Sequence, residues 1–186
     1  PLVDVKSSQT MRTVDRSVIE NTPTGRNFTD LILTAPGVVA DNYERAPVQS
    51  VHGQSVRNNL YNLDGAHATD DTVGYAVQNV NFDAVEELQV TTGGISAEYG
   101  QATGAVFNFI TKSGGNDFHG LASFYLQSDS LQGDNQTREL MAQGLTQGSR
   151  VVKNRDLGFN VGGPIKRNRI WFFVNYLNNI LEKTQP

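Results

Sequence analysis

Residues 96–115 read SAEYGQATGAVFNFITKSGG, in which two glycine-rich segments flank a run of strand-forming residues. Within the run, 105–112, apolar side chains lie on both faces of an extended chain and are interrupted by Asn108; they are Val106, Phe107, Phe109 and Ile110. A strand that is apolar on both faces is covered on both sides, which predicts that 105–112 is the central strand of a small sheet. Asn108 then needs hydrogen-bond partners inside the fold, and we expect it to be a structural residue rather than a ligand contact.

The glycines around this strand are open to two interpretations. They are Gly93, Gly94, Gly100 and Gly104 before it, and Gly114 and Gly115 after it. A phosphate-binding loop is disfavoured, because neither a Gly-Lys-Ser/Thr sequence nor G-x-G-x-x-G is present. We expect them instead to let the chain turn tightly and approach neighbouring backbone as it enters and leaves the strand.

Composition limits the class of protein. The 186 residues are enough for one domain, or for a domain and part of another. The 18 glycines, together with many Asn, Gln, Ser and Thr, favour a turn-rich β protein over a helical bundle. A net charge of −4 argues against a nucleic-acid partner, and the lack of cysteine excludes disulfides and thiolate metal sites.

The N-terminal part of the sequence predicts short helices between strands. Asn27 is a suitable N-cap and apolar residues then recur at helical spacing, which predicts a helix over Asn27–Ala35 that Pro36-Gly37 ends. A shorter helix is expected over Asp15–Glu20. The other expected elements are a strand with an Asp-Gly turn over Leu60–Gly65, an exposed loop over 66–81, a helical turn that opens at Asp83, and a strand over 88–92.

After Gly115 the pattern changes to strand alternation. Strands are expected over 118–128, 156–165 and 170–179, with a tight turn at Lys166–Arg169 and a long polar excursion over 128–153. Long loops on one side and tight turns on the other are typical of outer-membrane barrels. The aromatic residues of the last strand fit either a soluble core or the lipid band of a barrel. Because the smallest barrels need about eight strands, strands that face lipid here would be only the first strands of a barrel.

Several motifs occur in the order found in one family: GRNFTDLILTAPGV, YNLDG, VEELQVTTGGISAEYGQATGAVFNFITKSGGNDFHG and LGFNVGGPI. In this the chain resembles TonB-dependent outer-membrane receptors, and more narrowly their Oar-like branch. The resemblance implies an α+β plug domain over 1–116, a small mixed sheet with short helices, followed over 117–186 by antiparallel transmembrane β-barrel strands and the first extracellular loop. We therefore expect a segment of a larger barrel protein of the bacterial outer membrane, without a recognisable TonB box in 1–14.

The resemblance also implies functional positions. Glu87 and Glu98 are expected to form ion pairs with barrel arginines, and Arg57 to replace the arginine of the family's Ile-Arg-Gly element, where this chain has Val51-His52-Gly53. The residues that could face a substrate are Tyr43, Arg45, His67, Asp70, Asp71 and Tyr75. Each of them also fits an ordinary solvated loop, and that alternative stays open.

The function implied by the resemblance is gating. A plug fills a lumen of about 22 strands, a substrate binds from outside, and a TonB-type complex pulls a segment upstream of this chain; the other partners are lipid and the remainder of the barrel. The alternative is a structural, adhesion or secretion-linked barrel that transports nothing. We expect no enzyme, cofactor or metal, because Glu86-Glu87 and Asp70-Asp71 are adjacent and so diverge, and the three histidines lack metal-ligand spacing.

Overall fold

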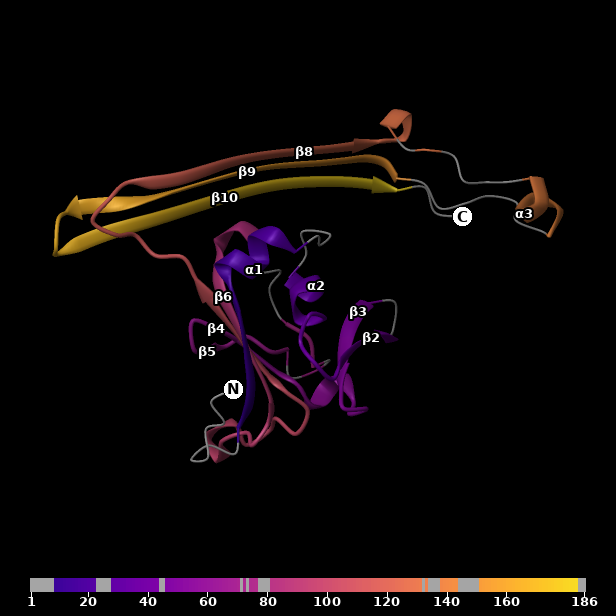
Figure 1. Ribbon diagram of the computed structural model, residues 1–186, viewed down its shortest axis with the longest axis horizontal. Coiled ribbons are helices and arrows are strands. Elements are labelled where there is room, and N and C mark those ends of the chain that lie inside the picture. Colours follow the sequence, from indigo (N-terminus) through magenta and orange to yellow (C-terminus); the bar gives the residue numbers. More distant parts are fainter. Residues whose placement is uncertain are drawn as a thin grey trace. The chain divides into compact units, whose positions relative to one another are not determined.

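A computed structural model describes residues 9–22, 28–43, 46–70, 72, 74–76, 81–131, 133, 138–143 and 151–183. The chain forms two compact units, Pro1–Lys112 and Ser113–Pro186 (Figure 1). Within the described ranges, no helix has the length and apolar character needed to cross a membrane.

The N-terminal unit is built on a five-stranded mixed sheet in the order β1-β6-β7-β4-β5. These strands are β1 (Thr10–Asp15), β4 (Leu60–Leu63), β5 (Ala66–His67), β6 (Val85–Gly93) and β7 (Val106–Thr111). The predicted central strand is confirmed: β7 pairs antiparallel with β6 and parallel with β4. Asn108 has the structural partners that we expected, since its amide nitrogen donates to Gln89 Oε1 at 3.4 Å and its oxygen accepts from Gly65 N at 3.3 Å.

Both faces of β7 are covered, as its sequence predicted. Phe107 and Phe109 are 0% and 1% exposed and belong to the main core. Phe107 stacks on Tyr61 with ring centroids 5.1 Å apart, and Phe109 meets the edge of Phe28 at 5.6 Å. On the opposite face, Val106 packs in a smaller cluster with Leu60 and Ala102. Burying such aromatic side chains is worth roughly 1.5–3 kcal/mol each, so β7 is the centre of this unit's stability.

Two short helices lie beside the sheet. The predicted first helix is confirmed as α1 (Arg16–Asn21), capped by Asp15. The second, α2 (Phe28–Ile32), is shorter than predicted, and the expected cap Asn27 lies outside the described residues. Leu33 N still donates to Thr29 O, but after Leu33 the hydrogen bonds span only three residues, from Thr34 N to Leu31 O and from Ala35 N to Ile32 O. Such bonds tighten the last turn of a helix. The chain then turns at Gly37, whose φ is +79°.

The remaining elements include one hairpin that the sequence did not indicate. It joins β2 (Val38–Tyr43) to β3 (Ala46–Val51). Three 3-10 turns follow: η1 (Val56–Asn58), η2 (Phe82–Ala84) and η3 (Ala97–Tyr99). The helical turn expected at Asp83 is present as η2, but it begins one residue earlier, because Asn81 is the cap and its side chain accepts from Asp83 N at 3.0 Å.

The C-terminal unit is an antiparallel sheet in the order β10-β9-β8, as predicted. Its strands, β8 (His119–Ser128), β9 (Val151–Lys166) and β10 (Ile170–Lys183), lie side by side as long ribbons (Figure 1). They contain 10, 16 and 14 residues, and about 9–11 tilted residues cross a bilayer. The polar excursion between β8 and β9 carries η4 (Asp129–Leu131) and α3 (Arg138–Ala142).

The two faces of this sheet differ in character. Along β9, Gly158, Asn160 and Gly162 are buried, whereas the alternate residues Leu157, Phe159 and Val161 are exposed. Leu157 and Phe159 on the exposed face are each 46% exposed, and Phe159 stacks on Tyr176 of β10 with centroids 5.3 Å apart. An exposed apolar face of this extent marks a surface that lipid or protein covers.

Candidate functional site: a polar pocket in the N-terminal unit

A cavity of about 250 Å³ lies in the N-terminal unit and is lined by Arg57, Asn59, Leu60, His67, Thr69, Asp70, Gly74 and Gln101. Three of these residues were predicted from the sequence to be functional: Arg57 as a contact between plug and barrel, and His67 and Asp70 as residues that could face a substrate. The structure brings them to one place. The lining offers a guanidinium, an imidazole, a carboxylate and two amides, so the pocket suits a ligand that both donates and accepts hydrogen bonds.

One wall of the pocket is a tight turn. Asp70 N donates to Tyr75 O at 2.7 Å and Gly74 N donates to Asp70 O at 2.6 Å. Gly74 has a φ of +77°, and a Cβ added there would lie 2.6 Å from the Cα of Arg57. A larger residue therefore cannot replace Gly74 without displacing Arg57. The loop predicted over 66–81 is accordingly folded back in part, with β5 and a bridge between Thr69 and Ala76.

The floor of the pocket is held by Asn59, a residue that sequence reasoning missed. Its side chain is 4% exposed. Its Nδ2 donates to Gln49 O at 2.7 Å, and its Oδ1 accepts from Ala105 N at 3.1 Å. From its place just before β4, this one side chain thus connects β3 with the chain just before β7.

A second buried contact supports the same floor. The Tyr61 hydroxyl donates to Gln49 Oε1 at 3.0 Å. Thr69 Oγ1 accepts from Tyr61 N at 2.8 Å and donates to Tyr61 O at 3.2 Å. Burial raises the pKa of Tyr61 to about 12, so this hydroxyl remains a donor at physiological pH. The two hydrogen bonds between Thr69 and the backbone of Tyr61 hold Thr69, a residue of the pocket lining, against β4.

The opposite wall is the loop that carries Gln101. Asn58 O accepts from Thr103 N at 3.1 Å and from Gly104 N at 2.9 Å. A Cβ at Gly104 would lie 2.5 Å from Asn59 Oδ1, so this glycine permits a close approach. At Gly100 a Cβ would have only the ordinary neighbour Ala97 O at 3.7 Å.

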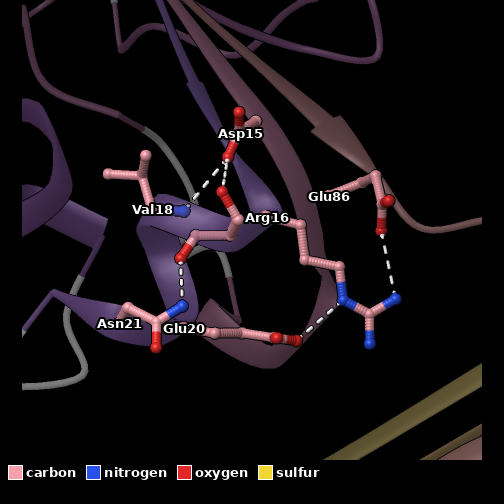
Figure 2. A network of polar contacts seen from close by, with 7 residues as sticks. Asp15, Arg16, Val18, Glu20, Asn21 and Glu86 are labelled. Carbon is pink, nitrogen blue, oxygen red and sulfur yellow. Dashed lines mark hydrogen bonds and ion pairs between the residues drawn. The ribbon is translucent and has the colours of Figure 1, made fainter.

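A second polar cluster ties α1 to β6 (Figure 2). The Arg16 side chain points between two carboxylates, with Nε 2.7 Å from Glu20 Oε1 and Nη1 3.9 Å from Glu86 Oε2. The hydrogen bond to Glu20 raises the pKa of Arg16. The hydrogen bonds from the Ser17 hydroxyl and Val18 N hold the pKa of Asp15 below its ordinary value. The cluster fastens the first helix to the sheet.

Lys112 lies at the end of the N-terminal unit, where burial, followed by the charge of Arg16, lowers its pKa. The sequence drew attention to Glu87, but it is Glu86 that pairs with an arginine inside this unit. Glu87 instead accepts from Gln89 Nε2 at 2.7 Å, and Glu98 is exposed in η3.

The other predicted positions are spread over both units. Gly93 ends β6, Gly94 follows with a φ of +62°, and Tyr43 is the last residue of β2. Arg45 and Asp71 lie outside the described residues. Gly114 lies against the backbone of Phe172, whereas Gly115 has open space around it. Among the residues that the structure describes, no three His, Asp or Glu side chains are grouped to hold a metal ion.

Comparison with known proteins accounts for both units. Residues 4–106 match the TonB-dependent receptor plug domain, and residues 110–185 match an outer membrane β-barrel domain. The TonB-dependent transporter Oar of Myxococcus xanthus is 30% identical over 185 residues, which are 95% of this chain and 17% of that protein.

Solved structures agree on the fold. The siderophore receptor PirA from Acinetobacter baumannii has a TM-score of 0.69 at 21% identity, and the match covers 94% of this chain and 25% of that receptor. The siderophore receptor PirA from Pseudomonas aeruginosa has a TM-score of 0.64 at 20% identity, and the match covers 92% of this chain and 27% of that receptor.

A mixed α+β domain followed by long antiparallel strands with an apolar outer face defines a plugged barrel of the bacterial outer membrane. The chain belongs to the TonB-dependent receptor family, as its motifs indicated. It comprises a plug domain and the first strands of the barrel, and it spans 17% of the length of the Oar transporter. The relatives with which it was compared are receptors and transporters.

Proposed function

We propose that the chain is the gating part of an energised outer-membrane transporter, in which the plug controls uptake of an extracellular substrate. The observation that carries this proposal is the pocket on the plug, where Arg57, His67 and Asp70 converge. In the proposed assignment, residues up to Lys112 form the movable plug, residues from 117 onward form the barrel wall, and the few residues between them connect the two.

The substrate that fits this pocket is polar. Arg57 and His67 supply donors for carboxylate or hydroxamate oxygens, and Asp70 accepts from hydroxyl or amine groups. A pocket of about 250 Å³ holds one polar group of a larger molecule rather than a whole drug-sized ligand. We therefore propose that the plug contacts one end of a polar molecule, and that extracellular loops of the barrel contact the rest.

The movable edge of the plug is β1. It lies at the end of the sheet and pairs only with β6 among the described strands. Of its side chains, only Val14 is buried. A TonB-type partner that pulls on a segment upstream would therefore work against backbone hydrogen bonds, one buried valine and the Arg16 ion pairs. Edges with so few buried contacts open at low free-energy cost.

Plug–barrel contacts complete the proposed mechanism. Glu98, exposed in η3, and Glu87, half-buried on β6, are proposed to pair with arginines of the barrel. Arg57 is assigned to the pocket instead of to this contact, because its backbone lies beside Gly74 in the pocket wall. The glycines that flank β7 are proposed to let the plug rearrange without breaking the central strand.

Uptake in cells tests the proposal. The full-length receptor is expressed in a deletion strain, and accumulation of radiolabelled ferric siderophores is measured with and without the energising partner. We expect uptake to require both, and to fall in Arg57→Gln and His67→Gln but not in the control Arg12→Gln, which changes an exposed residue of β1. If no tested chelate depends on the receptor while adhesion or secretion does, the non-transport alternative is favoured.

A further inference from the structure

The connecting segment 113–118 is held within the C-terminal unit by Asn116. Its Oδ1 accepts from Asn168 N and from Trp171 Nε1, each at 2.8 Å. Its Nδ2 donates to Asn168 Oδ1 at 2.6 Å. One side chain therefore makes three hydrogen bonds to the β9–β10 hairpin. Two of them join Asn116 and Asn168 in both directions across the turn, and the third comes from Trp171 on β10.

The backbone on either side of Asn116 also lies on this hairpin. A Cβ at Gly114 would collide with the backbone carbonyl of Phe172, so the segment touches β10 where only glycine fits. Phe118 packs near Phe172 with ring centroids 6.3 Å apart. A Cβ at Gly115, by contrast, would meet nothing within 4 Å. Contact is thus made before, at and after Asn116, which leaves little freedom to a segment that two glycines would otherwise make mobile.

The turn itself is shaped to receive Asn116. Asn168 has a φ of +60°, a left-handed conformation that asparagine tolerates better than most residues. This conformation directs its backbone N–H and its side-chain oxygen to the same neighbour. Asn168 and Asn116 therefore form a reciprocal pair, to which Trp171, the one tryptophan of the sequence, adds a third bond.

We propose that Asn116 is a positioning residue, which fastens the segment 113–118 to the β9–β10 turn and so fixes the end of the movable plug at Lys112. The fastening is a property of the C-terminal unit alone; its use in gating rests on the proposed function. When this end is fixed, force applied to the upstream segment acts directly on the strands between β1 and β7. When this end is free to move, the same force first extends the connecting segment.

Hydrogen exchange in the resting full-length receptor, in detergent micelles, tests the fastening without substrate or partner. The Asn168 amide is the reporter, because it donates to Asn116. Loss of a hydrogen bond of ordinary strength is expected to speed its exchange about tenfold in Asn116→Ala. The amides of β7 serve as the internal reference for intact plug folding and are expected to exchange at the wild-type rate.

Two glycine variants separate fastening from the loss of a single bond. Gly114→Ala removes no hydrogen-bonding group but collides with Phe172, so it is expected to speed exchange at Asn168 as well. Gly115→Ala, its neighbour in open space, is expected to leave exchange unchanged. An unprotected Asn168 amide in the wild-type receptor, or equal effects of the two glycine variants, would overturn the proposal.

The link between this fastening and gating is tested separately, by measuring uptake. In the uptake assay, Asn116→Ala is expected to bind a transported ferric siderophore with wild-type affinity and to take it up more slowly. Fast exchange at Asn168 combined with unchanged uptake would overturn the link to gating and leave the fastening intact. Loss of uptake in every receptor, wild type included, would instead count against the proposed function.

Discussion

Replacement of Asn59 by alanine is expected to weaken the plug more than its size suggests. The side chain accepts from Ala105 N and donates to Gln49 O, and it is 4% exposed. Alanine leaves the Ala105 amide buried without this acceptor, since Ala105 is itself 0% exposed. An orphaned buried group costs about 1–3 kcal/mol, and the lost bond to Gln49 adds roughly 1 kcal/mol. The expected loss is therefore about 2–4 kcal/mol.

Native-state hydrogen exchange of β7 in the full-length receptor measures this loss. A decrease of about 2–4 kcal/mol corresponds to roughly 30- to 700-fold faster exchange of amides that open with the plug. Asn58→Ala is the matched control, because among the residues that the structure describes the neighbouring side chain bonds only to Gln54 Oε1, at 3.1 Å in an exposed setting. Its effect is expected within about 0.5 kcal/mol.

A third variant distinguishes the two bonds. Asn59→Asp keeps an acceptor for Ala105 N but places carboxylate oxygen against the Gln49 carbonyl, so it is expected to destabilise the plug at least as much as alanine does. The reasoning is refuted if Asn59→Ala and Asn58→Ala change exchange equally, or if Asn59→Ala changes it by less than about threefold.

Three further predictions concern single positions. Gly104→Ala is expected to destabilise the plug by about 1–3 kcal/mol, because its Cβ would lie 2.5 Å from the amide oxygen of Asn59. Gly100→Ala should leave stability nearly unchanged. Equal hydrogen-exchange rates of β7 in the two variants would contradict this expectation. The pKa of Tyr61 is about 12 in the folded plug against 10.0 for the free group. Its stabilising effect is therefore complete below pH 10 and is lost as the pH rises to 12, by up to about 2–3 kcal/mol. Calorimetry at about pH 9–12 should show that the stability of Tyr61→Phe depends less on pH than that of the wild type. Arg16→Gln is expected to cost only about 0.2–1 kcal/mol, an effect that about 1 M salt removes, and a loss that salt does not change would argue against ion pairing.

Much of the architecture was predictable because it depends on local pattern. The central strand has apolar residues on both faces, and strand alternation located the barrel strands over 118–128, 156–165 and 170–179, although β9 begins earlier, at Val151, and β10 continues to Lys183. The β2–β3 hairpin was missed because its polar residues fall in adjacent pairs, Asp41-Asn42 and Gln49-Ser50, which break the alternation, and because it contains Pro47, which is unfavourable in most strands. Helix α2 was overestimated because periodicity continues to Ala35, while the hydrogen bonds change to a three-residue span after Leu33.

The site was predictable only as separate residues. Arg57, His67 and Asp70 could be named from residue type and resemblance, but their convergence depends on the turn at Gly74, whose positive φ the sequence does not reveal. Asn59 carries no local signal at all, because its partners Gln49 and Ala105 lie 10 and 46 positions away. A buried polar residue of this kind is defined by tertiary contacts alone.

The position of β7 in the sheet has a consequence for biosynthesis. It is the middle strand in space and the last strand of the plug in sequence. A chain that reaches the membrane with its N-terminus first cannot assemble the sheet until residues 106–111 arrive, because β6 and β4 have no shared neighbour before then. Its parallel pairing with β4 joins residues 46 positions apart, such as Leu60 and Val106, and such non-local contacts form slowly. The barrel strand β8 follows β7 almost at once, but its partner β9 begins only at Val151, so the plug becomes competent to fold before the first barrel hairpin is complete.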